Sequence, residues 1–264
     1  MSQMAVYKLL AADIDGTAVD HNSNGDEITA QHPAKIAVLA AQKQGKLVSL
    51  ATGRNFLWAQ PVIDAFEIKV PVIVNSGSRI VEPSSEQILW EKRLDTQKAK
   101  QIYNFILKNV DYSDFALGLG HRKEVAFAEA TDEMFEDVIY MDIIGVTDSI
   151  STTITDYVAT LESVASATPP SPQRLHLKNV IVTNSEGTKY NALKELQNIL
   201  GVTQNETIAV GDGNNDLPLF EASGLKVAVD NAGEELKKAA DLIVSSVHEH
   251  GMADVINKYL IEQN

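Results

Sequence analysis

The sequence predicts a doubly wound α/β fold built on a parallel sheet, with a second, smaller α+β domain inserted into it. Three observations support this prediction. Short apolar runs end abruptly in polar turns that contain glycine, amphipathic helical segments lie between those runs, and the pattern changes in the middle of the chain. Strands that alternate with helices form parallel sheets, and 264 residues are enough for two domains.

Four apolar runs are predicted to be strands of the parallel sheet. They are Val6–Ala12, Lys46–Ala51, Val70–Val74 and Glu206–Val210. They lack a strict alternation of apolar and polar residues, which is typical of strands buried on both faces. The polar turns that follow them are Asp13–Thr17, Thr52–Arg54, Asn75–Gly77 and Gly211–Asp216. Because ligands bind beyond the carboxyl ends of the strands in such sheets, we expect a functional site at this edge.

Helices are predicted between the strands. The stretch Thr29–Gln44 has Pro33 in its first turn and Gly45 directly after its end, which are typical helix boundaries. Lys189–Leu200 places three leucines at spacings of three and four residues, and Gly201 follows it.

The middle of the chain has no carboxylate-rich turns after its strands, and we interpret it as a separate module. We assign residues 82–183 to this α+β domain and residues 1–81 with 184–264 to the α/β domain. The elements expected in it are helices at Asp95–Asn109, Asp132–Tyr140 and Ile154–Ala167 and strands at Phe115–Leu119, Val125–Ala128 and Leu175–Thr183.

The composition excludes several classes of protein. The absence of cysteine excludes thiolate metal sites, iron–sulfur clusters and thiol nucleophiles. With 36 acidic and 22 basic residues, the net charge is −14, which disfavours binding to nucleic acids and anionic membranes. No apolar stretch approaches the length of a membrane-spanning helix, and the N-terminus does not resemble a leader, so we expect a cytoplasmic protein.

Two turns place carboxylates at the predicted site. Asp13 and Asp15 project on the same face of an extended backbone, and two carboxylates that share a site ionise together only if a cation intervenes. Asp212 and Asp216 add two more from a second strand end, and such oxygen ligands suit Mg²⁺. The alternatives are a capped strand end, the start of a calcium loop, and an ordinary polar surface turn.

A hydroxyl, an open backbone and two cations complete the predicted site. Thr52, Gly53 and Arg54 could contact a phosphate group, although the tripeptide is also found in routine turns. Lys189 opens a helix, where its charge opposes the helix dipole, and this indicates an anionic partner. A solvated lysine is the alternative.

Taken in order, the motifs around Asp13, Thr52, Lys189 and Asp212 resemble those of the haloacid dehalogenase-like superfamily. With Asn75-Ser76-Gly77 and the insertion after it, the chain resembles the Cof-type phosphatases with an α/β cap. The resemblance implies a Rossmann-like core and a cap that determines substrate specificity. It also implies Mg²⁺-dependent hydrolysis of small phosphomonoesters, with sugar phosphates expected, through an aspartyl-phosphate intermediate.

The resemblance also implies roles for individual residues. Asp13 would be the nucleophile and Asp15 the general acid and base. The phosphate-binding residues would be Lys189, which is also catalytic, with Thr52, Gly53, Arg54 and Asn215. The ligands of Mg²⁺ would be Asp13, Asp15 through its backbone carbonyl, Asp212 and Asp216.

Other functions and features stay open. A phosphotransferase of the phosphomannomutase kind would share this core, and a sensor of phosphorylated ligands would bind without turnover. The cap segment His121-Arg122-Lys123 could bind a second anionic group or be a solvated turn. Asp230 and His250 depart from the residues usual in relatives, and His248 with His250 is a conceivable metal pair. We expect Trp58 and Trp90 to pack in a core or between domains. The oligomeric state is not predicted.

Overall fold

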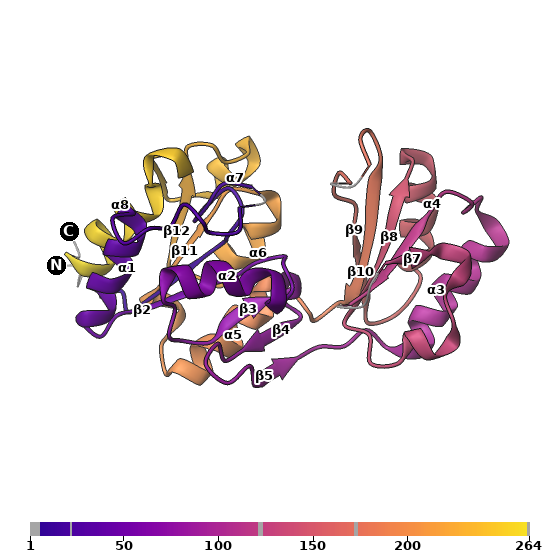
Figure 1. Cartoon of the computed structure of the whole chain (residues 1–264), viewed down its shortest axis with the longest axis horizontal. Helices are drawn as coiled ribbons and strands as arrows, with labels where there is room; N and C mark the ends of the chain where they lie inside the picture. Colours follow the sequence, from indigo (N-terminus) through magenta and orange to yellow (C-terminus); the bar gives the residue numbers. More distant parts are fainter. Residues whose placement is uncertain (1–5, 22, 121–123, 172–173, 263–264) are drawn as a thin grey trace. The chain divides into compact units, whose positions relative to one another are not determined.

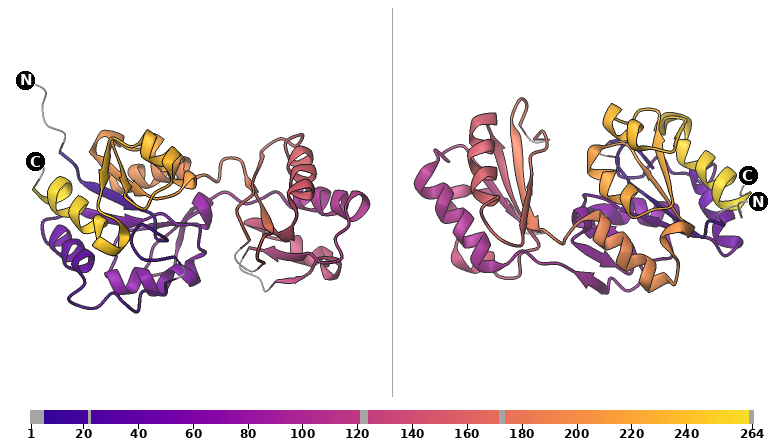
Figure 2. Two further views of the ribbon diagram at one scale, coloured as in Figure 1. Left: turned by 90° about the horizontal axis from the view of Figure 1, so that it is seen from above. Right: turned by 180° about the vertical axis from the view of Figure 1, so that it is seen from behind.

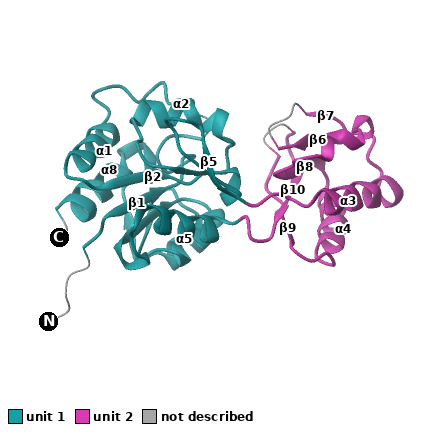
Figure 3. Cartoon of the chain, turned by 90° about the horizontal axis from the view of Figure 1, so that it is seen from below, with its two compact units in different colours: residues 1–91, 188–264 teal, residues 92–187 magenta. Residues whose placement is uncertain are grey.

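The computed structural model describes residues 6–21, 23–120, 124–171 and 174–262 (Figure 1). The chain divides into two compact units, Met1–Glu91 with Thr188–Asn264, and Lys92–Gly187 (Figure 3). The sequence places the inserted unit at 82–183, so its start is predicted ten residues earlier and its end four residues earlier. The first unit extends to Glu91 because β5 (Ile88–Glu91) pairs with β4 (Arg79–Val81) in one of its sheets.

The main sheet of the first unit is parallel and has the order β13-β12-β11-β1-β2. Its strands are β1 (Leu9–Ala12), β2 (Leu47–Leu50), β11 (Thr207–Gly211), β12 (Leu225–Val229) and β13 (Leu242–Val244). Every residue of β1 and β11 is buried, because helices cover both faces of the sheet (Figure 2). The predicted doubly wound α/β fold is confirmed.

The predicted strand at Val70–Val74 forms, but its pairing differs from the expectation. β3 (Val72–Val74) belongs to a small antiparallel sheet with β4 and β5, and a single parallel bridge from Ala51 to Ile73 connects it to the end of β2. The Asn75–Gly77 turn therefore still follows a buried strand beside the end of β2.

The helices of the first unit have well-defined ends. They are α1 (Pro33–Lys43), α2 (Phe56–Phe66), α5 (Lys189–Leu200), α6 (Leu217–Glu221), α7 (Glu234–Ala239) and α8 (Gly251–Val255), and the last continues into a π-helical turn at Ile256–Ile261. Helix α1 starts four residues later than predicted, because His32 precedes Pro33 and adopts the extended backbone that a following proline favours. Thr188 caps α5, and Gly201 ends it in the left-handed conformation.

The second unit is an antiparallel sheet with the order β7-β6-β8-β10-β9. Its elements are β6 (Ala116–Leu119), β7 (Val125–Ala126), β8 (Tyr140–Val146), β9 (Val164–Ala167), β10 (Lys178–Asn184), α3 (Thr96–Asn109) and α4 (Asp148–Val158). Alternate residues of β8, such as Met141 and Ile143, pack with Ile102 of α3 and Ile154 of α4 in a separate hydrophobic core. This unit is the predicted α+β module.

Two helix predictions in this unit are wrong. The predicted helix at Asp132–Tyr140 does not form. Residues 132–135 make one 3₁₀ turn, and β8 begins at Tyr140. Helix α4 ends at Val158, and Val164–Ala167, predicted to continue it, is β9. The second error arises because pairing with β10 decides β9, and local periodicity does not report such long-range contacts. In the first segment, residues 136–139 form no helix and only Tyr140 pairs with β10. Within the described ranges, no helix has the length and apolar character needed to span a membrane.

Candidate active site

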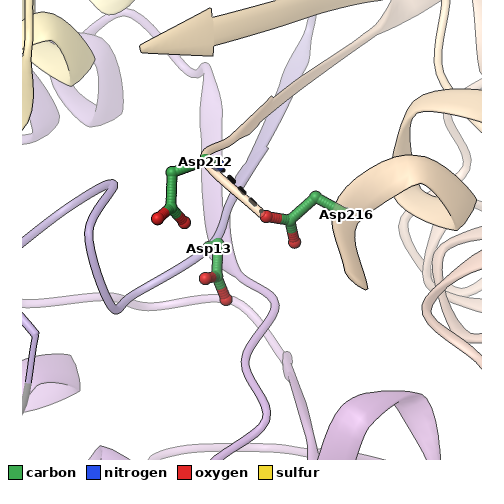
Figure 4. Close-up of side chains that lie close together, drawn as sticks. All are labelled: Asp13, Asp212 and Asp216. Atoms are coloured by element: carbon green, nitrogen blue, oxygen red, sulfur yellow. Dashed lines mark hydrogen bonds between the residues drawn. The ribbon is translucent and has the colours of Figure 1, made fainter. Parts of the chain in front are cut away.

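Three carboxylates converge at the carboxyl edge of the parallel sheet (Figure 4). β1 and β11 are neighbours in register, so Asp13 and Asp212, each the first residue beyond its strand, meet at the same edge. Asp216 turns back toward them, and its Oδ2 accepts hydrogen bonds from the backbone N–H groups of Asp212 (3.1 Å) and Gly213 (3.2 Å). One carboxylate oxygen from each aspartate lies within 4.8 Å of the other two.

Lys189 provides positive charge at this cluster. Its side chain is only 2% exposed, and its ammonium group donates to Oδ1 of Asp13 at 2.8 Å and to Oδ1 of Asp216 at 2.6 Å. The backbone that carries it is positioned by Gly77, whose φ is +101°. A Cβ at Gly77 would lie 2.1 Å from the carbonyl carbon of Thr188, so the Asn75–Gly77 turn packs directly against the first residues of α5.

The electrostatics of the cluster favour a bound cation. Burial raises the pKa of Asp13 to about 7; Lys189 opposes this shift, and Asp216 and Asp212 add to it. Burial, followed by Asp216, raises the pKa of Asp212. Burial disfavours the charged form of Lys189, but the two carboxylates outweigh it, and the pKa of Lys189 is above its usual value. Three carboxylates thus share one ammonium group, and a set of hard oxygen donors with excess negative charge fits Mg²⁺.

Asp15 contacts a different partner from Asp13. Its carboxylate makes a two-point ion pair with Arg54, with Nε to Oδ2 at 2.8 Å and Nη2 to Oδ1 at 2.5 Å. The side chain is therefore held by Arg54 and is not one of the three carboxylates that converge. A bidentate pair of this kind fixes both the position and the plane of the carboxyl group.

The remaining predicted phosphate contacts lie at the neighbouring strand ends. Thr52 is buried directly after β2, and its Oγ1 accepts a hydrogen bond from the backbone N–H of Arg54 at 3.0 Å, which leaves its own proton to donate. Gly53 is exposed, so its backbone is open to a ligand. Asn215 is exposed in the turn before α6, and its Oδ1 lies over Gly213, where a Cβ would approach it to 2.4 Å.

Some residues at the site were not predicted. The hydroxyl of Thr17 donates to Oδ1 of Asp212 at 3.2 Å, and the amide of Asn231 donates to the carbonyl of Gly16 at 2.7 Å. Nε2 of His21 lies 3.6 Å from Oδ2 of Asp212. Thr17 could have been found, because it belongs to the first motif. The other two contacts depend on chain folding that no local pattern reports.

Other residues singled out in the sequence have partners outside the carboxylate cluster. His248 pairs with Asp20 at 3.2 Å, while the ring of His250 packs edge-on against His32, so the two histidines diverge and do not form a metal pair. Asp230 is exposed and lies 3.7 Å from Lys237.

The two tryptophans differ in burial. Trp90 packs against the core of the first unit, whereas Trp58 is 64% exposed and does not belong to that core. The segment His121-Arg122-Lys123 lies outside the described residues.

Comparisons with known proteins identify the family of this chain. The family model described as haloacid dehalogenase-like hydrolase matches residues 10–256. A phosphoglycolate phosphatase of Methanopyrus kandleri is 27% identical, over 96% of this chain and 97% of the relative. A 5-amino-6-(5-phospho-D-ribitylamino)uracil phosphatase of Bacillus subtilis is 24% identical, over 97% of this chain and 99% of the relative.

The fold of this chain is also similar to that of a solved phosphatase structure. A solved structure of a haloalkanoate-superfamily phosphatase from Bacteroides thetaiotaomicron superposes with a TM-score of 0.77 and 21% identity, covering 97% of this chain and 96% of that one. The expected fold is thereby confirmed, and the expected phosphatase class agrees with the names of the relatives. The chain belongs to the haloacid dehalogenase-like hydrolase family.

Proposed function

We propose that the protein is a Mg²⁺-dependent phosphatase that hydrolyses small phosphomonoesters through an aspartyl-phosphate on Asp13. The observation that carries the proposal is the placement of the Asp13 carboxylate against Lys189, beside Asp212 and Asp216, at the carboxyl edge of the parallel sheet. Phosphoryl transfer needs positioning and positive charge more than elaborate covalent chemistry. This cluster supplies positioned carboxylates and the Lys189 ammonium, and Mg²⁺ bound to the carboxylates would supply the remaining positive charge.

Asp13 is the nucleophile in this proposal. One of its oxygens attacks phosphorus, the bond from phosphorus to the alcohol oxygen breaks, and the phosphoryl group is carried on the carboxylate. Lys189 favours the ionised form of Asp13 and neutralises part of the charge on the phosphate oxygens, because its ammonium is 2.8 Å from Oδ1 of Asp13. Bound Mg²⁺, held by Asp13, Asp212, Asp216 and the backbone carbonyl of Asp15, would supply further positive charge against the repulsion between carboxylate and phosphate.

Asp15 is the general acid and then the general base. Protonated Asp15 gives its proton to the departing alcohol oxygen, and the carboxylate that results accepts a proton from the water that attacks the phosphoryl group on Asp13. Arg54 is the positioning residue for this carboxyl group, because its two contacts at 2.5 and 2.8 Å fix the carboxyl plane.

The other proposed contacts hold the transferring phosphoryl group. Thr52 donates its hydroxyl, Gly53 offers its exposed backbone, and Asn215 offers its amide. These groups come from the ends of β2 and β11, and Lys189 comes from the start of α5, so no single turn forms the phosphate site.

We further propose that the second unit, Lys92–Gly187, decides which phosphomonoesters are accepted, with sugar phosphates as the expected class. The proposed partner is therefore a small molecule. A cytoplasmic location and the absence of nucleic-acid and membrane partners follow from the sequence arguments of charge and hydropathy and stay predictions.

Release of inorganic phosphate tests the proposal. Purified protein is incubated with a panel of sugar phosphates, phosphoglycolate and glycerol 3-phosphate, with Mg²⁺ and with EDTA, and Asp13→Asn serves as the inactive variant. We expect release that requires Mg²⁺ and disappears in the variant. An isomeric sugar phosphate in place of free phosphate would indicate a phosphotransferase, and equal release by Asp13→Asn would contradict the mechanism.

A further inference from the structure

Two large apolar side chains stand in solvent beside the proposed active site. Helix α2 begins directly after the Thr52–Arg54 turn, and in its first turn Leu57 is 71% exposed and Trp58 is 64% exposed. Single exposed apolar residues are ordinary, but two adjacent ones that include a tryptophan form an informative patch. In the described part of the chain, the indole makes no hydrogen bond or ring contact. Packing within its own unit therefore does not explain why a tryptophan stands at this position.

The backbone of Trp58 is connected to the proposed acid by one side chain. Nη1 of Arg54 donates to the carbonyl of Trp58 at 3.3 Å, and the same guanidinium holds Asp15. The N–H of Trp58 donates to Oδ1 of Asn55, the N-cap of α2, at 3.0 Å. Both backbone polar groups of Trp58 are therefore bound locally, and the point from which the indole projects is fixed relative to Asp15.

The direction of the side chain also favours the active-site edge. Long side chains in a helix lean toward its N-terminus and cover the turn that precedes their own Cα. Trp58 is the third residue of α2, so this rule directs the indole toward Gly53 and Arg54. A rigid ring with two rotatable bonds offers a large apolar surface at a low cost in conformational entropy.

We propose that Trp58 is a specificity-determining residue whose indole packs against the alcohol part of the substrate. The ligand class that fits is a phosphomonoester whose alcohol contains a ring with an apolar face, in preference to a two- or three-carbon chain that has no such face. This inference rests on the proposed phosphatase function and adds to it the kind of leaving group. A ring stacked on the indole is worth up to about tenfold in kcat/KM.

Kinetics of matched variants test the inference. We compare kcat/KM for glucose 6-phosphate and p-nitrophenyl phosphate, which contain rings, with phosphoglycolate and glycerol 3-phosphate, which do not. In Trp58→Ala, we expect a loss of about tenfold on the ring-containing esters, mostly through KM, and little change on the other two. Trp58→Phe should keep most of the activity. Leu57→Ala, which removes equally exposed apolar surface from the same turn, should leave all four rates unchanged.

The outcomes separate this inference from the function on which it rests. If no ester of the panel releases phosphate, the proposed function fails. If phosphate is released but Trp58→Ala lowers all four rates equally, or Leu57→Ala matches its effect, the role of the indole is refuted. Preferential turnover of phosphoglycolate by the wild type, or a change from dimer to monomer in Trp58→Ala by light scattering, would also overturn it.

Fluorescence gives a readout that does not depend on turnover. The chain has two tryptophans, so Trp90→Phe leaves Trp58 as the single emitter. In that variant, with Asp13→Asn added to prevent turnover, we expect glucose 6-phosphate to shift the emission and to protect the indole from iodide quenching. Inorganic phosphate should do neither. Unchanged emission at saturating sugar phosphate would contradict the inference.

Discussion

Replacing Lys189 with methionine removes the ammonium group and keeps most of the side chain's volume. It leaves Asp13 and Asp216 buried without the cation that contacts both at 2.8 and 2.6 Å. Removing one partner of a buried ion pair costs about 3–5 kcal/mol. For a chain of this size, that corresponds to a fall in Tm of roughly 6–20 °C in EDTA at pH 8.

The loss should depend on pH, and its sign follows from Asp13. The pKa of this carboxyl is already raised by burial to about 7 in the folded protein, and Lys189 is the group that lowers it. Without Lys189, the pKa of Asp13 in the folded protein rises further above its value in the unfolded chain. The folded variant then binds more protons than the unfolded chain, so its stability falls as the pH rises above the usual value of 3.8. Below about pH 7 Asp13 is protonated in both folded proteins, so the deficit relative to wild type grows mainly above that pH.

Thermal unfolding in EDTA at pH 5.5 and pH 8 measures this effect. Adding Asp13→Asn to Lys189→Met should restore part of the lost stability at pH 8, because one of the two stranded carboxylates is gone. Lys194→Met is the control, since Lys194 lies on the same helix with a single 3.4 Å contact to Gln204, and its change should stay within about 0.5 kcal/mol. A deficit below 1 kcal/mol, or one that is equal at both pH values, would refute the reasoning.

Three further predictions concern the same site. Asp13→Asn should abolish phosphate release yet raise Tm by a few degrees in EDTA at pH 8, because burial disfavours the ionised carboxylate, and this gain should shrink as the pH falls from about 7 toward 3.8. Arg54→Lys should lower kcat roughly 10- to 100-fold, because a point charge cannot make the two-point pair with Asp15; an unchanged kcat would exclude a positioning role. Gly77→Ala should cost more than about 2 kcal/mol in chemical unfolding and lower phosphate release, because its Cβ would lie 2.3 Å from the backbone nitrogen of Lys189; wild-type stability would contradict this contact.

Much of the first unit could be predicted from its sequence, since its strands are buried on both faces and helix ends carry proline, glycine and threonine. The Thr188 cap and the Gly201 stop of α5 are local signals that the structure bears out. In the second unit, the sequence predicts helix where β9 forms and predicts no strand where β8 forms, because long-range pairing decides both strands.

The carboxylate cluster was predictable because its residues follow strands that the sequence predicts. Asp13 and Asp212 follow buried strands, and neighbouring parallel strands deliver their ends to one edge. The pairing of Asp15 with Arg54 was not foreseen, because side-chain partners across 39 residues leave no periodic trace. The exposure of Trp58 was not predicted, because an aromatic residue at a helix start is usually packed.

The most direct test of the central claim is to trap the covalent intermediate. Wild-type protein is mixed with a turned-over phosphomonoester and Mg²⁺, quenched in acid and reduced with borohydride, which converts an acyl phosphate to an alcohol. Peptide mass spectrometry then locates the change. The account predicts homoserine at Asp13, absent in EDTA and absent in Asp13→Asn. Rapid phosphate release with Asp13 unmodified at every quench time, or a modified residue elsewhere, would contradict it.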